Sequence, residues 1–161
     1  MKPCKFVKDS EIEMTELVLP NDTNQLGNLL GGRLMHWMDI AAAISAQRHS
    51  NRVCVTAFVD ELYFHHPIHL GEIVRLKATV NRTFNTSLEV GVKVIAEDQL
   101  LGKSKIANEA FFTFVAVDEN KKPAMVCQVK PQTKEEKKRF SEALSRRKHR
   151  LERKSGKKSH R

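Results

Sequence analysis

Long hydrophobic stretches are missing from this sequence of 161 residues. No apolar run approaches the roughly 20 residues that a membrane-spanning helix needs, and the first residues lack the apolar segment of a signal peptide. We therefore expect no membrane insertion, and a reducing cytoplasm is the simplest setting for the chain.

Cysteine is equally scarce. The three cysteines, Cys4, Cys54 and Cys127, stand far apart, and no Cys-x-x-Cys pair occurs. This pattern argues against both a disulfide framework and a zinc knuckle. Three histidines lie close together at positions 65–69, but they lack acidic or cysteine partners on their loop. We therefore expect no bound metal ion.

Aromatic side chains that stack well on nucleic-acid bases are also few, with one Trp and one Tyr. Residues 134–161 hold 13 Lys and Arg against 4 Asp and Glu, so this segment carries the whole net charge of +9. A basic segment favours anions such as phosphorylated small molecules, nucleic acid or acidic lipid headgroups. Because stacking rings are rare, we expect no nucleic-acid partner, and residues 154–161 have the composition of a solvated tail.

Apolar periodicity predicts one strand, one long helix and then four more strands. The helix carries apolar and small side chains at helical spacing, and Ala41, Ala42 and Ala46 suit close packing on a sheet. Strands at such short spacing favour an antiparallel sheet. The fold class is therefore α+β, a curved antiparallel sheet wrapped around one helix. The predicted strands are 11–19, 53–64, 73–80, 88–95 and 105–117, and the helix is 31–50.

A second helix is predicted over residues 133–153. Thr133 followed by Glu136 fits a capping box at its start, and three apolar residues give it only a thin stripe. Such a helix lies on the surface or against a neighbouring subunit. We divide the chain into a domain of residues 1–130 and a basic C-terminal helix and tail of residues 131–161.

The segment from Asn24 to Asp39 is the best candidate for a reaction centre. Asp39 stands inside an apolar run, and a buried carboxylate is costly without a partner or a task. A polar loop with Asn24 precedes the glycine pair Gly31 and Gly32, where the helix begins. Backbone N–H groups at a helix start can bind a negatively charged substrate group.

These residues resemble a known family. The element order resembles the hotdog fold, and the pattern Asn24-x-x-Gly27-x-x-x-Gly31-Gly32-x-x-Met35-x-x-x-Asp39 is similar to the signature of hotdog acyl-CoA thioesterases with an Asn and an Asp in the active site. Three later stretches are similar to other strands and turns of that family, namely residues 55–60, 84–89 and 110–116.

The resemblance implies hydrolysis of fatty acyl-CoA to free fatty acid and CoA, without a metal or an organic cofactor. Asp39 of one subunit is then the general base or the nucleophile, and Asn24 of the other subunit binds the carbonyl oxygen. Gly31 and Gly32 at the helix N-terminus complete the oxyanion site. The family forms dimers at minimum and often trimers of dimers, so a homo-oligomer is implied.

The same resemblance implies where CoA binds. Backbone groups on two strands hold the pantetheine arm, and arginines of the C-terminal helix contact the phosphates in bidentate fashion. These implied CoA contacts are Ala57, Phe58, Val59, Thr86, Ser87, Leu88, Arg146 and Arg147.

Two other readings stay open. The chain could be a hotdog protein that binds acyl-CoA without turning it over, and Asp39 could be a structural acid bonded to backbone N–H groups. The dehydratase branch of the hotdog fold uses a His in a glycine-bearing loop together with a Glu. His36 and His66 do not stand in that context.

Overall fold

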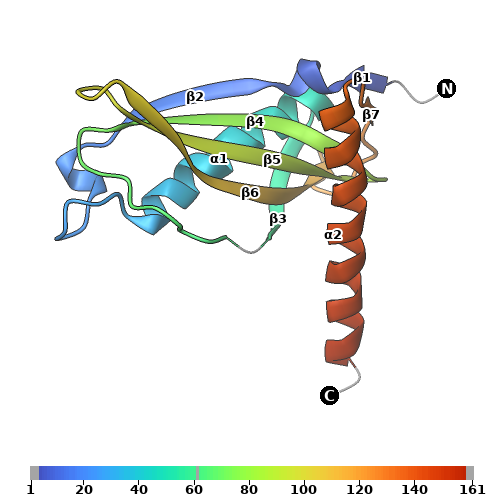
Figure 1. The fold of residues 1–161 in the computed structure, drawn as a ribbon. Coiled ribbons are helices and arrows are strands. Elements are labelled where there is room, and N and C mark those ends of the chain that lie inside the picture. Colours follow the sequence, from blue (N-terminus) through green and yellow to red (C-terminus); the bar gives the residue numbers. More distant parts are fainter. Residues whose placement is uncertain (1–3, 61, 159–161) are drawn as a thin grey trace.

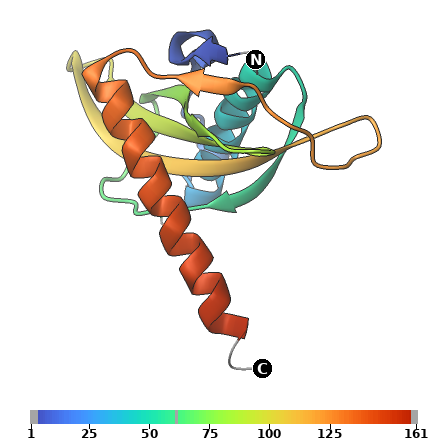
Figure 2. The same ribbon diagram turned by 90° about the vertical axis from the view of Figure 1, so that its right-hand side faces the viewer.

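The computed structural model describes residues 4–60 and 62–158. Five strands form one antiparallel sheet that curls around helix α1, as Figures 1 and 2 show from two sides. The strand order is β2-β4-β5-β6-β3, so β2 and β3 lie at the two edges. The α+β prediction is confirmed. The elements are β2 (Ile12–Leu17), α1 (Gly31–Ser50), β3 (Val53–Val59), β4 (Ile73–Thr83), β5 (Ser87–Asp98) and β6 (Lys103–Val117).

The core lies between α1 and the inner face of the sheet. Every second residue of β4 points inward and is fully buried, namely Val74, Leu76, Ala78 and Val80. On the helix side, Ala41, Ala42 and Ala46 are fully buried as well. These short side chains allow the helix backbone to approach the sheet closely, as their sequence pattern predicts.

The sequence pattern does not predict two short strands of the structure. β1 (Cys4–Phe6) pairs in parallel with β7 (Gln128–Lys130) and forms a separate two-stranded ribbon. The 3₁₀ turns η1 (Val7–Ser10) and η2 (Pro20–Asp22) flank β2. A segment of three residues is too short to show a period of two or of 3.6, so sequence patterning cannot detect it.

The predicted strand over 53–64 is too long. β3 ends at Val59, the backbone N–H of Asp60 still donates to the Phe111 carbonyl at 2.9 Å, and residues 62–64 form no strand. Phe64 instead lies beside the start of α1, where its ring would be 3.2 Å from a Cβ added to Gly31. In this segment Leu62 packs against the core, whereas the side chains of Tyr63 and Phe64 are largely exposed.

Helix α2 (Lys134–Lys158) crosses the outer face of the sheet, and its C-terminal half extends beyond it (Figures 1 and 2). The capping box is confirmed, because the Glu136 N–H donates to Thr133 Oγ1 and the Thr133 N–H donates to the Glu136 carboxylate, each at 3.1 Å. The proposed domain boundary at residue 130 falls between β7 and α2. Within residues 4–60 and 62–158, no helix is both long and apolar enough to cross a membrane.

Ser10 joins three elements inside the core. Its hydroxyl donates to the Val7 carbonyl at 2.6 Å and accepts from the Val80 N–H at 2.9 Å, while its own carbonyl accepts from the Ser45 hydroxyl at 2.8 Å. Ser10 is fully buried, so no water can replace these partners. This single residue therefore ties η1 to β4 and α1.

We expect Ser10→Ala to lower the free energy of unfolding by about 1–3 kcal/mol, because the buried Val80 N–H loses its acceptor. Chemical denaturation measures this value, with Ser141→Ala on the exposed face of α2 as the control. Equal stabilities of the two variants would contradict the role assigned to Ser10.

Candidate active site

Asp39 projects from α1 toward the edge strand β3. Its Oδ1 atom accepts a hydrogen bond from the Thr56 hydroxyl at 2.7 Å. Asp39 is half-buried, whereas its neighbour Met38 is fully buried, because successive helical residues point in directions about 100° apart. The carboxylate thus borders the apolar core without being enclosed by it. Sequence reasoning missed Thr56, whose link to Asp39 depends on how α1 and β3 pack.

Asn24 sits in a tight turn before α1. Its side-chain carbonyl Oδ1 accepts from the backbone N–H groups of Leu26 at 3.0 Å and Asn28 at 3.1 Å. Both bonds fix the orientation of the amide group, as in an Asx turn. Its amide nitrogen makes no hydrogen bond to the described residues and can donate to a ligand. No hydrogen bond joins Asn24 to Asp39 within the part of the chain that the structure describes.

The N-terminus of α1 is open to a ligand. The N-cap residue Leu30 has no side chain that could accept from the first-turn N–H groups, which have no partner inside the helix. A Cβ added to Gly32 would meet nothing within 4 Å, so the backbone lies open there. An ion pair of 3.1 Å between Arg33 and the buried Asp22 anchors this turn to η2.

β3 carries a bulge at the predicted pantetheine contact. Thr56 is the register partner of Phe114, and Phe58 that of Thr113, which leaves Ala57 without a partner in the ladder. β3 is also an edge strand with exposed Val53 and Val55. A bulged edge strand has backbone N–H and C=O groups that neighbouring strands do not satisfy. Val59, the last residue of β3, is half-buried.

The second predicted CoA segment lies at the start of β5, beside α2. The Ser87 hydroxyl accepts from Arg147 Nη1 at 3.3 Å, so the structure brings two predicted contacts together. Thr86 precedes the strand, and its carbonyl already accepts from the Ala116 N–H at 2.9 Å. Leu88 is fully buried in the core.

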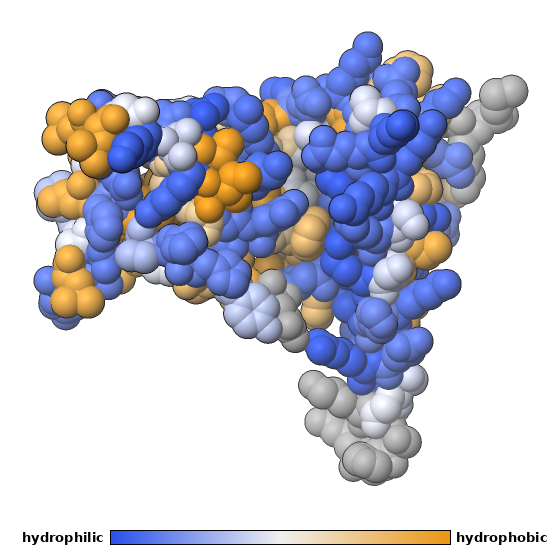
Figure 3. Space-filling view, viewed as in Figure 1, coloured by the Kyte–Doolittle hydropathy of each residue, from blue (hydrophilic) through white to orange (hydrophobic). Residues whose placement is uncertain are grey.

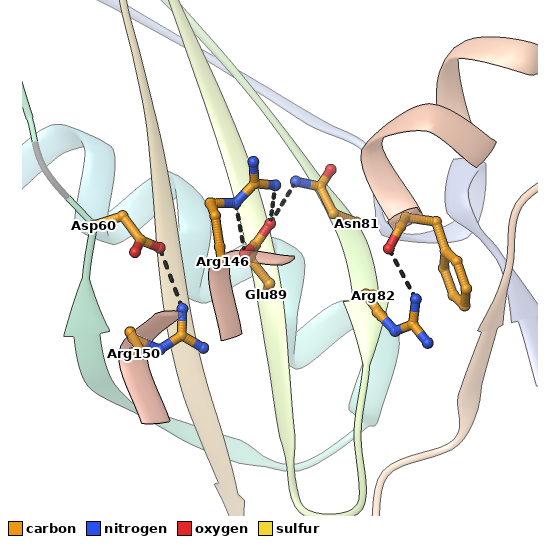
Figure 4. Close-up of polar contacts among 7 residues, drawn as sticks. Asp60, Asn81, Arg82, Glu89, Arg146 and Arg150 are labelled. Carbon is orange, nitrogen blue, oxygen red and sulfur yellow. Dashed lines mark hydrogen bonds and ion pairs between the residues drawn. The ribbon is translucent and has the colours of Figure 1, made fainter. Parts of the chain in front are cut away.

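Arg146, which is predicted to contact the phosphates of CoA, forms an ion pair inside the protein instead of pointing freely into solvent. Its Nε and Nη2 atoms donate to the two carboxylate oxygens of Glu89 at 3.0 and 2.7 Å (Figure 4). Its guanidinium also lies 3.6 Å from the centre of the Phe111 ring. Much of the hydrogen-bonding capacity that the prediction reserves for phosphate is therefore used inside the protein.

Arg150, one helical turn further along, was not among the predicted residues. Its Nη1 atom lies 3.4 Å from Asp60 Oδ2, and its guanidinium lies 5.1 Å from the centre of the Phe58 ring. Burial raises the pKa of the Asp60 carboxyl, and the charge of Arg150 opposes that shift. The spacing of Arg146, Arg150 and Arg153 along α2 is the sequence signal that could have found Arg150.

A groove of about 440 Å³ runs between the end of β3 and α2. Hydrophilic side chains cover α2 in the space-filling view of Figure 3. The groove combines aromatic rings with several cationic side chains, a composition suited to a nucleotide with phosphate groups. Its lining residues are Phe58, Val59, Asp60, Tyr63, Phe111, Arg146, His149, Arg150 and Arg153.

Two of the three histidines at positions 65–69 contact other side chains. His69 Nδ1 lies 2.8 Å from Asn28 Oδ1, a contact that ties the loop after β3 to the turn before α1. His65 stacks on Tyr63, with ring centres 6.0 Å apart. In the described parts of the chain, no group of three or more His, Cys, Asp or Glu could hold a metal ion.

Comparisons with known proteins show which family the chain resembles. Residues 26–103 match the Thioesterase superfamily. The chain is 45% identical to mouse Acyl-coenzyme A thioesterase 11 over 142 residues, which are 88% of this chain and 24% of the mouse protein. It is 43% identical to the uncharacterized acyl-CoA thioester hydrolase YkhA of Bacillus subtilis over 132 residues, which are 82% of this chain and 77% of YkhA.

Solved structures show the same fold. An apo-hexameric acyl-CoA thioesterase superimposes with a TM-score of 0.90 at 40% identity, covering 93% of this chain and 96% of the other. An acyl-CoA hydrolase from Staphylococcus aureus in complex with butyryl coenzyme A superimposes with a TM-score of 0.90 at 34% identity, covering 98% and 96%. The chain therefore belongs to the hotdog-fold acyl-CoA thioesterase family.

Proposed function

We propose that this protein hydrolyses the thioester of fatty acyl-CoA to free fatty acid and CoA. The observation that carries the proposal is the Asp39–Thr56 hydrogen bond of 2.7 Å, next to an edge strand with unsatisfied backbone groups. An oriented carboxylate beside backbone groups that can hold an extended substrate arm supports this function. A cytoplasmic role in fatty acid metabolism is part of the same proposal.

The three side chains of the proposed site have counterparts in a relative. Structures exist of the S. aureus hydrolase with an asparagine, an aspartate and a threonine each replaced by alanine. The same numbers of residues separate those three positions as separate Asn24, Asp39 and Thr56 here. This agreement supports treating them as one catalytic unit.

Asp39 acts as the general base on a water molecule in this proposal. The Thr56 hydroxyl donates to Oδ1 and orients the carboxylate, so the other oxygen can accept a proton from water. The water oxygen attacks the thioester carbon, the C–S bond breaks, and CoA leaves as a thiolate. A direct attack of the carboxylate on the thioester is the alternative role of Asp39.

The oxyanion forms on the carbonyl oxygen of the thioester when water attacks. The Asn24 amide nitrogen and a backbone N–H near Gly32 are suitable donors, because Asn24 is held in place by its carbonyl and Gly32 is open. A thiolate is a good leaving group and needs no strong general acid. The proposed reaction therefore requires neither a metal ion nor an organic cofactor.

We propose that two subunits share each site. Asn24 and Asp39 make no hydrogen bond with each other in the described chain, and the β3 edge next to Thr56 is exposed. A second copy of the chain at this edge brings its Asn24 to Asp39. The hexameric relative supports an assembly of at least a dimer, and a trimer of dimers is our proposal for this chain.

CoA then runs from the bulge in β3 to α2. Backbone groups at Ala57, Phe58 and Val59 hold the pantetheine arm, and Arg147 binds phosphate from its position beside Ser87. Arg147 is suited to this task because no ion pair joins it to a carboxylate among the described residues. Its guanidinium lies 4.2 Å from the centre of the Phe84 ring, which leaves its edges for oxygen ligands.

We expect Asp39→Ala to lower the rate of thiol release by about 10²–10⁴-fold, the usual contribution of a general base. A colorimetric thiol assay with short, medium and long acyl-CoA esters measures the rate, with Glu119→Ala as the control at an exposed carboxylate. Undiminished turnover in Asp39→Ala would contradict a catalytic role for Asp39. Binding of acyl-CoA by the wild-type protein without thiol release would favour the non-catalytic alternative.

Two replacements of Thr56 distinguish the effect of its hydroxyl group from the effect of its side-chain volume. Thr56→Val keeps the volume but removes the donor to Asp39, so we expect kcat to fall by about 10- to 100-fold, as for loss of a hydrogen bond to a charged group. Thr56→Ser keeps the hydroxyl and should retain most of the rate. The idea fails if the kcat values of the two variants agree.

A further inference from the structure

Glu89 is a fully buried carboxylate on the side of the sheet that α1 does not cover. Its neighbours on β5, Leu88 and Val90, point into the core, so Glu89 points to the outer face beneath α2. Alternation predicts an exposed residue at such a position. A buried carboxylate is costly unless donors surround it, so Glu89 requires an explanation that the proposed chemistry does not supply.

Three N–H donors satisfy this carboxylate. Two come from Arg146 of α2, at 3.0 and 2.7 Å, and the third comes from Asn81 Nδ2 of β4, at 3.0 Å (Figure 4). Gly91 makes room for the third, because a Cβ there would lie 2.9 Å from that nitrogen. The cluster is therefore a built feature in which β4, β5 and α2 each contribute a side chain.

The bidentate pair fixes α2 both in place and in rotation. Two parallel N–H···O bonds hold the planar guanidinium of Arg146 in one orientation, and the Phe111 ring supports its face at 3.6 Å. A slip of the helix by one residue would turn it by about 100° and carry Arg146 away from Glu89. Together with the contacts of Arg147 to Ser87 and of Arg150 to Asp60, this pair sets how this part of α2 lies on the sheet.

Arg147, the residue after Arg146, is the arginine that our proposed function assigns to the phosphates of CoA. Arg146 pairs with Glu89 and Arg150 with Asp60, whereas no carboxylate lies within ion-pair distance of Arg147 among the described residues. Arg147 is half-buried against Phe84 and Ser87. An arginine held at the surface of the fold without a carboxylate partner is ready to bind an anion.

We propose that Glu89 is a positioning residue that holds Arg147 at the phosphates of CoA, and thereby makes the enzyme select CoA thioesters over thioesters of pantetheine alone. The inference rests on the proposed thioesterase function and extends it to substrate selection. Glu89 touches neither the substrate nor the reacting atoms. Its effect is confined to the nucleotide end of CoA, far along the substrate from the bond that breaks.

The test compares two substrates that differ only in the nucleotide end. Steady-state kinetics with an acyl-CoA and the matching acyl-pantetheine are measured for the wild type, Glu89→Gln and Glu97→Gln. Glu97 is a control, because it also lies on the outer face of β5 and pairs with an arginine, Arg75, while no hydrogen bond or ion pair joins it to α2 among the described residues. Glu89→Gln keeps the size of the side chain and removes its charge.

We expect Glu89→Gln to raise KM for acyl-CoA by about 10- to 100-fold, as for loss of a charge-assisted bidentate contact. The value of kcat should stay within about twofold, and KM for acyl-pantetheine should not change. Glu97→Gln should match the wild type with both substrates. An unchanged KM for acyl-CoA, or an equal rise for both substrates, overturns the proposal.

A second variant covers the case in which Glu89→Gln does not fold. Arg146→Lys keeps the positive charge but loses the bidentate geometry. It should therefore raise KM for acyl-CoA and leave KM for acyl-pantetheine unchanged. Equal KM changes for the two substrates would again overturn the proposal. A wild-type protein that hydrolyses neither substrate overturns the proposed function and this inference with it. If the wild type hydrolyses both and the variants leave the ratio of KM values unchanged, only the role of Glu89 fails.

Discussion

The close packing of α1 on the sheet sets the position of Asp39 relative to the edge strand β3. Ala41, Ala42 and Ala46 are fully buried at this contact, and their short side chains bring the helix backbone near the strands. Only at this separation does Asp39 reach the Thr56 hydroxyl across the gap between α1 and β3. The turn that contains Asn24 leads into the open N-terminus of α1, which the Arg33–Asp22 ion pair anchors to η2.

The two faces of the sheet have different tasks. The inner face is apolar and buries α1, so it supplies the stability that a polar site on the rim requires. The outer face holds α2 through a buried ionic cluster around Glu89, to which our proposal assigns the positioning of α2. In our account the chemistry depends on the inner contact, and recognition of the nucleotide end depends on the outer one.

Sequence patterning could predict the parts of the fold that repeat a period several times. The helix over residues 31–50 and the inward-facing residues of β4 follow directly from it. It could not predict β1 and β7, which are too short, nor the end of β3 at Val59, because the apolar Leu62 and Phe64 look like strand residues until their packing is known.

Some residues of the site could be predicted from a local sequence motif, whereas others depend on contacts between distant parts of the chain. Asn24 and Asp39 stand in a recognisable motif, and their catalytic roles remain predictions. Thr56 and the Glu89–Arg146 pair depend on contacts between elements far apart in the sequence, which no local pattern encodes. Alternation even indicates the wrong environment for Glu89, because the outer face is buried there by a helix that follows much later in the chain.

The central claim is that one site combines Asp39 of one subunit with Asn24 of another. Its most direct test mixes two inactive variants, Asp39→Ala and Asn24→Asp, under conditions in which subunits exchange. Asn24→Asp keeps the oxygen that accepts from Leu26 and Asn28 but removes the amide donor. Random pairing in a symmetric dimer restores one intact site in each mixed dimer, so thiol release should recover to about one quarter of the wild-type rate. A mixture that stays as inactive as the two variants alone would contradict a shared site.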